Sequence, residues 1–326
     1  MKLHLKEERP LLYFSGVGSS GMGEDAFIKN GAKYRCFSYA YTSPDGFYYS
    51  KKIAESLKIA EKKGMGVMMD SAAHSFHKLK VLGLRKKSGK WSVKDTDKLR
   101  DKVVETYAQY VLKEGKKWDF VVNFDYVRDC PVIYAMQKQL EKLGIRPVPV
   151  YHGDQPDEWL KRYCEEGHKL ICLGSVKRSN KYMRYYYDRC FNIAAKYGVL
   201  LHGLAVTSLS LMYGYEWYSV DSATWAKVAA FGCILSTSAG VNDTFGYIHL
   251  SDRRHGQGRG IEYLDLPKNK QREINHEIED NGFDPKQLLT DGAARSMYNV
   301  YIFCNRIQHL KEVVRSGKTR WQSLAV

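Results

Sequence analysis

Two aspartates follow short apolar segments of the chain and precede candidate helices. Asp70 closes the segment 65–69, and Asp221 closes the segment 217–220. A carboxylate at the carboxyl end of a strand lies where a parallel α/β barrel builds its active site. Two such carboxylates on one rim can divide the work of a glycosyl transfer, one attacking the sugar carbon and the other moving protons. A lone strand-end aspartate is more often a helix N-cap, so the surrounding elements decide the matter.

Short apolar runs alternate with longer amphipathic runs along most of the chain. The predicted strands are residues 11–15, 65–69, 120–124, 147–151, 170–173, 199–202, 217–220 and 234–237. The predicted helices are residues 96–114, 132–143, 157–166, 181–196 and 224–230. Gly144, Gly167 and Gly198 stand where helices should stop, and Asp129 before Cys130 and Pro131 is interpreted as a helix cap or a turn residue.

The strand ends distinguish a closed barrel from a doubly wound open sheet. The predicted strands are followed by Gly16, Asp70, Asp125, His152, Gly174, Gly203, Asp221 and Ser238. In a barrel these small and reactive groups converge on one mouth, whereas in an open sheet only those near the switch point would meet. Because strands and helices alternate, the sequence predicts an α/β fold, a TIM (β/α)8 barrel with loop insertions and a C-terminal helical extension.

The length fits one barrel of roughly 250 residues plus a tail, or two smaller domains. Neither an internal repeat nor a low-complexity linker is visible, so we expect a single domain over residues 1–326 with a barrel core at about 10–240. Residues 74–95 form a basic, glycine-punctuated loop, and residues 239–286 a polar, irregular excursion. A final helix is expected over about 293–314, so the excursion and this helix occupy about 241–326.

The charge and the cysteines bear on partners and compartment. The formal charge is +15, and a basic surface attracts polyanions, nucleic acid first and membrane surfaces second. Many proteins are basic for solubility alone. Because no signal peptide and no apolar run of about 20 residues is visible, we expect a cytoplasmic protein with no membrane partner. The seven cysteines are scattered and never form a Cys-x-x-Cys pair, which predicts reduced thiols that fill the core.

Residues 16–21 match the Gly-x-Gly-x-x-Gly dinucleotide pattern after a strand. A Rossmann unit would continue with a full helix and an acidic residue about 20 positions on. Here the following segment is short, and the aromatic run 34–41 ends without an acid. A flexible loop lining the mouth is therefore the preferred interpretation over a cofactor cradle.

Several short motifs, taken in order, resemble the tRNA-guanine transglycosylase superfamily, and most of all its shorter viral and bacterial branch that places 7-deazaguanine bases into DNA. The resemblance covers roughly residues 60–240. The matching segments are 70–74 at the family's Asp-Ser-Gly-Gly-aromatic motif, 123–125 at its base-reading aspartate, 151–154 at its Gln-Gly element, 173–176 at its Gly-Gly loop, and 202–207 with 218–222 at the segment that carries its nucleophile.

The resemblance implies a role for each matched residue. Asp221 would be the nucleophile that holds the sugar as a covalent ester while the bases exchange. Asp70 would be the general acid and base. Asp125 would accept the adjacent N–H donors of a guanine-type base, because a carboxylate is the natural bidentate acceptor. The other implied base-binding residues are His152, Gly174, Ser175, His74, Gly203 and Leu204.

The chain also departs from the family pattern. Ala72 and Ala73 replace paired glycines, which narrows the expected pocket. The family's structural zinc site uses a Cys-x-Cys-x-x-Cys cluster and a histidine, and this chain lacks the cluster. His309 is the only matching ligand position, with Cys304 one turn before it, and two ligands do not make a tetrahedral site. We therefore expect no metal and no cofactor; further conceivable ligands are Cys233, His249 and His255.

The polymer that the resemblance implies is double-stranded DNA with a flipped target nucleotide, and the small-molecule substrate is a 7-deazaguanine base. Residues 180–189 interleave basic and aromatic groups, and 253–259 are cationic. Such mixtures suit phosphate contacts and stacking on bases, although the first could equally be a helix that packs its tyrosines on the barrel. The implied nucleic-acid contacts are Arg184, Arg253, Arg254 and Arg259. A homodimer is also possible, because this superfamily often dimerises.

Three alternatives stay open at this point. The first is a tRNA-guanine transglycosylase that acts on RNA, because charge does not separate DNA from RNA. The second is a non-catalytic nucleic-acid-binding barrel, against which the presence of both Asp70 and Asp221 argues. The third is an unrelated barrel enzyme that acts on a small phosphorylated metabolite, which the glycine-rich first loop suggests.

Overall fold

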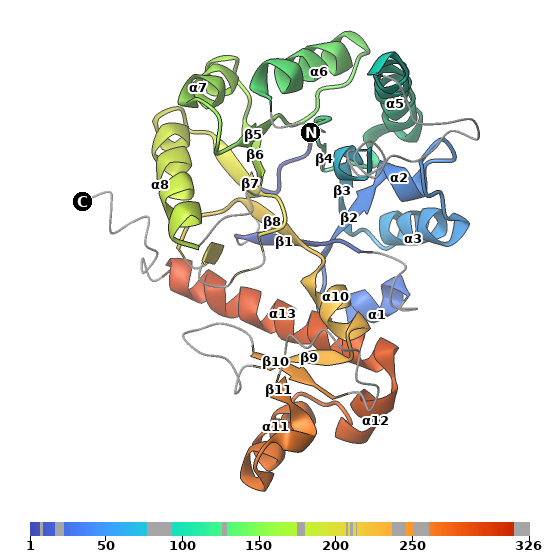
Figure 1. Cartoon of the computed structure of the whole chain (residues 1–326), viewed down its shortest axis with the longest axis vertical. Helices are drawn as coiled ribbons and strands as arrows, with labels where there is room; N and C mark the ends of the chain where they lie inside the picture. The colour runs from blue at the N-terminus through green and yellow to red at the C-terminus, as the bar shows by residue number, and fades with distance from the viewer. Residues whose placement is uncertain are drawn as a thin grey trace. The chain divides into compact units, whose positions relative to one another are not determined.

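A computed structural model gives the fold of the chain (Figure 1). It describes residues 1–6, 9–16, 23–76, 93–125, 129–174, 180–206, 208, 211–212, 214–236, 246–250 and 261–315. For residues 93–97, 116, 180–181 and 306–315 only the backbone is described.

Eight strands form one sheet in the order β4-β3-β2-β1-β8-β7-β6-β5. They are β1 (Leu11–Phe14), β2 (Tyr34–Ser38), β3 (Gly66–Asp70), β4 (Phe120–Val121), β5 (Val150–His152), β6 (Leu170–Gly174), β7 (Leu200–Gly203) and β8 (Ser219–Ser222). The described pairings β2–β3, β3–β4, β5–β6, β6–β7 and β7–β8 are all parallel.

An isolated parallel bridge closes the ring of strands. It joins Val122, directly after β4, to Val148, just before β5. The Val148 amide donates to the Val121 carbonyl at 2.7 Å, and the Asn123 amide donates to the Val148 carbonyl at 3.0 Å. The order of strands around the ring is therefore the order of the sequence, which confirms the predicted (β/α)8 barrel.

The strands are continuous apolar runs because both of their faces are covered. Met68, Met69, Ile171, Cys172 and Leu173 are fully buried. The helices that follow strands in unit 1, defined below, are α2 (Tyr39–Thr42), α3 (Lys51–Lys62), α5 (Val93–Glu114), α6 (Cys130–Lys142), α7 (Asp157–Glu165) and α8 (Asn180–Lys196), with the short turn η1 (Gly115–Lys117) after α5.

The predicted helix boundaries are confirmed to within a few residues. Gly144, Gly167 and Gly198 follow α6, α7 and α8 with φ values of 90°, 83° and 63°, the left-handed conformation that ends a helix. Asp129 caps α6, because its side chain accepts a hydrogen bond from the Val132 amide at 3.3 Å. The long helix predicted at 96–114 begins earlier, at Val93, and residues 77–92 of the expected basic loop lie outside the described residues.

One strand assignment was wrong. The segment predicted at 234–237 is β9 (Cys233–Ser236), which belongs to a separate three-stranded sheet with β10 (Gly246–His249) and β11 (Ile261–Glu262). The missing barrel strand is β2, whose apolar run is interrupted by Arg35, a fully buried arginine. Periodicity cannot tell which sheet a short buried run joins, and a charged residue hides a strand from it.

Residues 239–286 are also more regular than expected. Besides β10 and β11 they contain η2 (Tyr263–Asp265), α11 (Lys268–Asp280) and the start of α12 (Pro285–Thr290). Helix α11 has a narrow buried face that consists of Gln271, Ile274 and Ile278, and most of its other residues are polar or charged. The final helix, α13 (Gly292–Arg315), confirms the prediction of 293–314.

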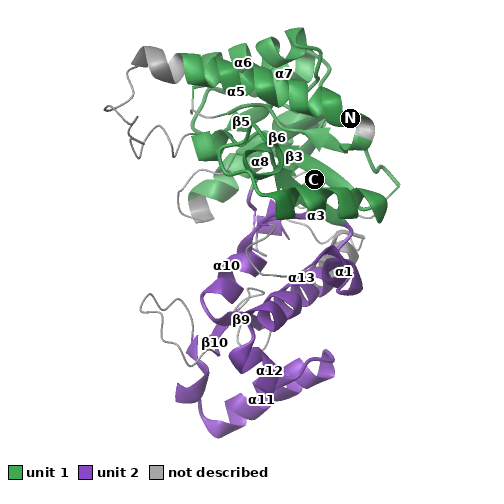
Figure 2. Ribbon diagram, turned by 90° about the vertical axis from the view of Figure 1, so that its right-hand side faces the viewer, with its two compact units in different colours: residues 1–7, 34–204, 217–220 green, residues 8–33, 205–216, 221–326 purple. Residues whose placement is uncertain are grey.

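The chain divides into two compact units (Figure 2). Unit 1 comprises residues 1–7, 34–204 and 217–220, and unit 2 comprises residues 8–33, 205–216 and 221–326. Unit 1 contains most of the barrel. Unit 2 contains β1, α1 (Glu24–Lys29), α10 (Thr224–Ala230), the three-stranded sheet and the C-terminal helices.

The N-terminal segment covers the amino ends of strands in unit 1. His4 Nε2 lies 2.8 Å from the Asp119 carboxylate, next to β4, and the His4 ring packs edge-on against Tyr34 at the start of β2. The His4 amide donates to the Tyr218 hydroxyl at 2.9 Å, next to β8. His4 therefore connects the N-terminal segment to residues at the amino ends of β2, β4 and β8.

Aromatic side chains build the core of unit 2. The rings of Phe14, Phe27 and Trp225 pack edge to face, and Phe303 of α13 joins them. Asn299 of α13 binds α10 and β9 together, because its side chain accepts from the Leu235 amide at 2.8 Å and donates to the Trp225 carbonyl at 3.1 Å. Helix α13 is thus an integral part of this unit.

Six of the seven thiols are buried and the seventh, Cys304, is partly buried, which confirms their expected place in the core. Among the residues that the structure describes, none of the helices combines the length and the apolar character needed to cross a bilayer.

Candidate functional site

Asp70 is the last residue of β3, as predicted, and its side chain is half-buried. One carboxylate oxygen accepts a hydrogen bond from the amide of Ala72 at 3.1 Å. Ala72 has a φ of 68°, in the left-handed region that favours glycine. The backbone at Ala72 therefore has a glycine-like conformation although the residue is alanine.

Asp221 lies in β8, one residue before its end, in unit 2. Its Oδ1 accepts the amide of Ala205 at 2.8 Å, and its Oδ2 accepts the hydroxyl of Ser15 at 3.3 Å. Ser15 is fixed in turn, because its amide donates to the Ser222 carbonyl and its carbonyl accepts from the indole of Trp225. The half-buried carboxylate is thus oriented by two donors.

Both aspartates share an unusual type of partner. Of the non-glycine residues in the described part of the chain, Ala72 and Ala205 are the ones with positive φ, at 68° and 54°. Each donates its amide to one of the two aspartates. An alanine in this conformation costs about 1–2 kcal/mol, and such strain persists only where the surrounding structure imposes it, most often at functional sites.

Asp125 and His152 are brought together by the structure. Asp125 follows β4, and His152 is the last residue of β5. His152 Nε2 lies 3.1 Å from Asp125 Oδ2, and the side-chain exposures are 8% for His152 and 16% for Asp125. The segment before Asp125 is held by Asn123, whose side chain donates to the Ile133 carbonyl and accepts from the Phe124 amide. The carboxylate is therefore the more exposed member of a fixed pair.

Gly174 ends β6 and makes room for His152. A Cβ at position 174 would lie 2.2 Å from Cε1 and 2.3 Å from Nδ1 of the His152 ring, so no other residue fits without moving the imidazole. This gives Gly174 a steric role beside the backbone contact to a base that the resemblance implies. Among the residues that the structure describes, the buried Nδ1 atom of His152 has no hydrogen-bond partner.

The pKa of Tyr107 in α5 responds to the charges of Asp70 and Asp125. Its hydroxyl donates to the Val122 carbonyl at 2.9 Å. Burial raises its pKa well above the ordinary value, and the charge of Asp70, then that of Asp125, adds to the rise. The charges of Asp70 and Asp125 thus both act on one buried phenol. Sequence analysis missed this residue, because a tyrosine on a long amphipathic helix carries no local signal.

The other predicted base-binding residues are placed as follows. Gly203 ends β7, is buried and pairs with Val220, and the amide of the half-buried Leu204 donates to the Leu173 carbonyl at 3.0 Å. His74 is exposed, four residues after Asp70. Ser175 lies outside the described residues.

The tyrosines of α8 divide between the two interpretations offered for this helix. Tyr186 and Tyr187 are buried in the core of unit 1, as an amphipathic helix requires, whereas Tyr185 is 62% exposed. Arg184 is half-buried. Arg253, Arg254 and Arg259 lie outside the described residues.

The candidate metal ligands do not assemble within the described ranges. No group of three His, Cys, Asp or Glu side chains able to hold an ion occurs there. His249 instead pairs with the Glu262 carboxylate at 3.0 Å, and Cys233 lies opposite His249 in the small sheet. The side chain of His309 and all of His255 lie outside what is described.

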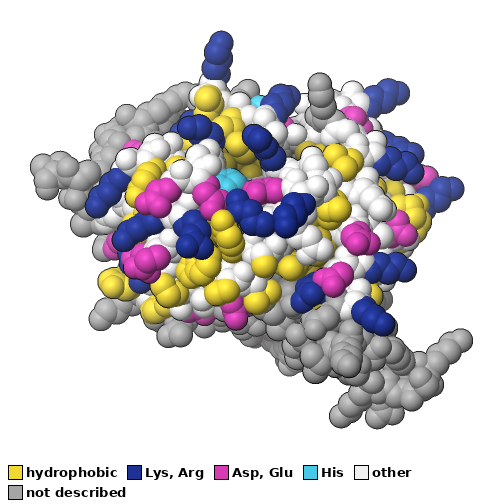
Figure 3. Space-filling model, turned by 90° about the horizontal axis from the view of Figure 1, so that it is seen from above, with side chains coloured by type: hydrophobic (Ala, Val, Ile, Leu, Met, Phe, Trp, Pro, Cys, Tyr) yellow, Lys and Arg dark blue, Asp and Glu magenta, His cyan; other side chains and the backbone are white. Residues whose placement is uncertain are grey.

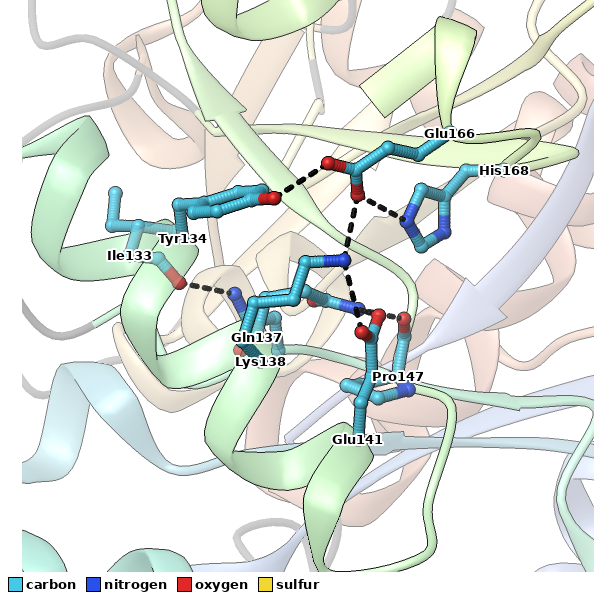
Figure 4. Close-up of polar contacts among 9 residues, drawn as sticks. Ile133, Tyr134, Gln137, Lys138, Glu141, Pro147, Glu166 and His168 are labelled. Atoms are coloured by element: carbon cyan, nitrogen blue, oxygen red, sulfur yellow. Dashed lines mark hydrogen bonds and ion pairs between the residues drawn. The ribbon is translucent and has the colours of Figure 1, made fainter. Parts of the chain in front are cut away.

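The outer face formed by α5, α6 and α7 does not present a continuous basic patch. Lys and Arg side chains are interspersed with Asp and Glu there (Figure 3). Lys138 shows why, since its ammonium lies 3.0 Å from Glu141 and 2.8 Å from Glu166, and Tyr134 also donates to Glu166 (Figure 4). Cations that are paired in this way are poor sites for a polyanion.

Asp70 belongs to unit 1 and Asp221 to unit 2. The structure thus groups Asp70, Asp125 and His152 with Tyr107 in one unit, and Asp221 with Ser15 and Ala205 in the other. That Asp70 and Asp221 face one nucleoside stays a prediction. Ser15 is a further residue that sequence analysis missed, because the pattern predicts the end of a strand at Ser15 and indicates Gly16 as the group at the rim.

No protein-family model matches the chain, and no curated protein matches it. Among solved structures, it is similar to a protein of Aquifex aeolicus VF5, with 13% identity and a TM-score of 0.42 over 68% of this chain and 86% of that one. It is also similar to a tryptophan synthase from M. tuberculosis, with 9% identity and a TM-score of 0.38 over 68% of this chain and 86% of that one. A GH10 endoxylanase from a sugarcane soil metagenome has 12% identity and a TM-score of 0.41 over 90% of this chain and 84% of that one. All three scores are below 0.5, so they do not bear on the chemistry of this chain.

Proposed function

We propose that this protein exchanges guanine in DNA for a 7-deazaguanine base through a covalent intermediate on Asp221. One observation carries the proposal: each of the two strand-end aspartates is held by the amide of an alanine in a strained, left-handed conformation. A helix cap needs no such strain, as Asp129 illustrates. The resemblance of the motifs to the transglycosylase superfamily gives the two carboxylates their roles.

In the first half-reaction the Asp221 carboxylate attacks C1′ of the target nucleotide. The bond from C1′ to the guanine nitrogen breaks, and its electron pair leaves with the base. The Asp70 carboxyl group donates a proton to the departing guanine, which makes it a better leaving group. The products are a glycosyl ester on Asp221, free guanine and an ionised Asp70.

The second half-reaction reverses these steps with a different base. Ionised Asp70 takes the ring N–H proton of the incoming 7-deazaguanine, and the nitrogen attacks C1′. The ester bond to Asp221 breaks, which regenerates its carboxylate. The hydrogen bonds from Ala205 and Ser15 to Asp221 stabilise the carboxylate as the leaving group and orient it for the next attack.

Recognition of the base falls to Asp125 and His152. One oxygen of Asp125 is engaged by His152 at 3.1 Å, and this contact fixes the plane of the carboxylate. A carboxylate held in this plane can accept adjacent N–H groups from the edge of a guanine-type base. The same edge occurs in guanine and in 7-deazaguanines, so one site serves both the leaving and the incoming base.

The choice of polymer rests on the overall charge and on the resemblance, and not on individual contacts. The charge of +15 favours a polyanion, and a base inside a duplex must leave the stack before its C1′ becomes accessible. The choice of DNA rests on the closer resemblance to the DNA-acting branch.

The test is incorporation of a labelled 7-deazaguanine into DNA by the full-length protein, followed by mass spectrometry of the nucleosides. Wild type should incorporate the label, and Asp221→Asn should lose at least about a thousandfold in rate. Matched controls are Asp129→Asn in unit 1 and Asp284→Asn in unit 2, because both aspartates are helix caps and asparagine caps equally well.

Two results would overturn this function: absence of label from both DNA and RNA, or equal incorporation by Asp221→Asn and wild type. Label that enters tRNA but not DNA would keep the chemistry and replace the polymer. A denaturant-stable adduct between DNA and wild type, absent from Asp221→Asn, would add direct support for the covalent intermediate.

A further inference from the structure

The segment after β2 brings two tyrosines side by side. Helix α2 ends at Thr42, and the following loop, residues 43–50, folds back along it. The Tyr48 amide donates to the Ala40 carbonyl at 2.8 Å, and the Ser50 amide donates to the Tyr41 carbonyl at 2.9 Å. As a result the rings of Tyr41 and Tyr48 stack, with centroids 5.5 Å apart and planes inclined by 28°.

Two neighbouring residues fix this loop. A Cβ on Gly46 would lie 2.4 Å from the Tyr39 carbonyl oxygen and 2.5 Å from that of Ala40, so the turn requires glycine. The ring of Phe47 packs against Phe76, and Phe76 packs edge-on against Phe124. Phe76 follows Asp70 by six residues and Phe124 directly precedes Asp125. The loop is therefore anchored to the segments that carry Asp70 and Asp125.

The stacked tyrosines face solvent. Tyr41, Tyr48 and Tyr49 are 39%, 42% and 46% exposed, although Tyr39 of the same short helix is fully buried and donates to Thr106. Partial burial raises the pKa of Tyr41, and the charges of Tyr48 and then Asp70 add to the rise. Ser38, three residues before Tyr41, pairs with Asp70 where β2 and β3 end, so the tyrosines follow the same end of the strands as the Asp70 carboxylate.

Cations follow the pair directly. Lys51 and Lys52 are exposed at the first turn of α3, which Ser50 caps. Asp45 and Glu55 are the exposed acidic residues of the same stretch. Exposed aromatic rings beside lysines form the arrangement that binds unpaired nucleotides, because bases stack on the rings and phosphates contact the ammonium groups.

We propose that the Tyr41–Tyr48 pair is a stacking platform for unpaired bases of the nucleic-acid strand next to the exchanged nucleotide, with Lys51 and Lys52 on its phosphates. The identity of the strand rests on the proposed function, whereas the binding itself does not. Stacking tolerates any base, since every base has a π-face. The platform holds the strand open near Asp70 without reading its sequence.

The test is fluorescence anisotropy of a labelled single-stranded oligonucleotide with the full-length protein at fixed salt. The double variant Tyr41→Ala/Tyr48→Ala should bind roughly 5- to 150-fold more weakly, the range that corresponds to about 1–3 kcal/mol of stacking. Tyr41→Phe/Tyr48→Phe keeps both rings and should bind like wild type. Tyr197→Ala is the matched control, because Tyr197 is 41% exposed but precedes the amino end of β7.

Unchanged affinity of the alanine double variant would overturn the platform, and so would an equal loss in Tyr197→Ala. A second measurement needs no variant: photocrosslinking to an oligonucleotide with halogenated pyrimidines should label the peptide that contains Tyr41 and Tyr48. Label confined to other peptides would contradict the proposal. The two proposals fail separately, because tyrosine-dependent binding without base exchange refutes only the catalytic function, and exchange with tyrosine-independent binding refutes only the platform.

Discussion

The two ends of unit 1 each carry a histidine–aspartate pair, and the pairs face opposite ways. At the amino ends of the strands, His4 and Asp119 lie 2.8 Å apart with side-chain exposures of 16% and 2%. At the carboxyl ends, His152 and Asp125 lie 3.1 Å apart with exposures of 8% and 16%. In the first pair the carboxylate is the enclosed member, and in the second it is the member that reaches solvent.

The surroundings follow the same division. The amino-end pair includes a residue of the N-terminal segment, His4, whose ring packs against Tyr34 and whose amide donates to the Tyr218 hydroxyl. The carboxyl-end pair rests on Gly174, and the charges of Asp125 and Asp70 both raise the pKa of the buried Tyr107. A buried carboxylate with a histidine partner stabilises a fold, whereas an outward carboxylate held by a buried histidine presents an acceptor to a ligand. The orientation of the pair, not its composition, separates the two roles.

The largest expected effect is on activity at the carboxyl end. Asp125→Asn should lower kcat/KM for base exchange on the order of 10²–10³-fold, because an amide replaces one acceptor oxygen with a donor. Its urea midpoint should stay close to wild type. Asp119→Asn should show the opposite pattern, with normal exchange per folded molecule. Similar loss of exchange in both variants would erase the distinction between the ends.

The largest effect on stability is expected at the amino end. Asp119→Ala should lower the free energy of unfolding by about 3 kcal/mol, since the buried carboxylate is the partner of His4. Asp125→Ala should cost less than about 1 kcal/mol, because its carboxylate is partly solvated. Urea unfolding of both variants measures the difference. A greater loss for Asp125→Ala would reverse the assignment of roles.

A third prediction concerns the support under the outward pair. Gly174→Ala should displace the His152 ring, lower the free energy of unfolding by roughly 1–3 kcal/mol and raise KM for the incoming base. Gly292→Ala is the control, since a Cβ there would meet its nearest atom at 3.5 Å, an ordinary contact. If Gly174→Ala bound base as wild type does, His152 would not position Asp125.

A smaller effect tests the strained alanines. Ala72→Gly removes the strain of a left-handed alanine, which stabilises the folded state, and adds flexibility to the unfolded chain, which opposes this gain. Because the strain is the larger effect, the free energy of unfolding should rise by up to about 1 kcal/mol. Ala205→Gly should behave alike in unit 2. Ala73→Gly, at a neighbouring position without positive φ, should instead be neutral or destabilising. Thermal or urea unfolding would contradict the strain if all three variants lost stability equally.

The smallest effect is expected at a third histidine–carboxylate pair, which serves as a comparison for the pairs at the two ends. His168 lies 3.9 Å from Glu166 on the outside of unit 1. Burial lowers its pKa, Glu141 and Glu166 oppose this, and Lys138 and Arg146 add to it. Because the folded state then binds fewer protons than the unfolded state below the ordinary histidine pKa of about 6.5, stability should fall on acidification through that value.

The free energy of unfolding of His168→Gln, measured with urea, should therefore fall less than that of wild type between pH 7.5 and 5.5. The difference between the two falls should be well under about 1 kcal/mol. Glu166, whose carboxylate is paired with Lys138, has a lowered pKa, so it loses its contribution only at more acidic pH. Equal drops in wild type and His168→Gln would show that this histidine does not contribute.

Strand ends were predictable where an apolar run stops at a polar or small residue, as at Asp70, His152 and Gly174. Strand β2 was not, because Arg35 breaks its run while the barrel buries the side chain completely. The partners of the site residues were equally out of reach. Ser15 contacts Asp221 across 206 positions of sequence, and Tyr107 approaches Asp70 from a helix. Local patterns locate the ends of elements, and only the closed fold determines which ends meet.

The ring of strands has a seam at Val122 and Val148, where a single bridge joins two short strands. Asp125 and His152 stand on opposite sides of this seam and connect across it. A base that binds Asp125 would thus stabilise the joint between β4 and β5. Amide hydrogens of Asn123 and Val148 should exchange with solvent more slowly once the base is bound, which turns barrel closure into a reporter of occupancy.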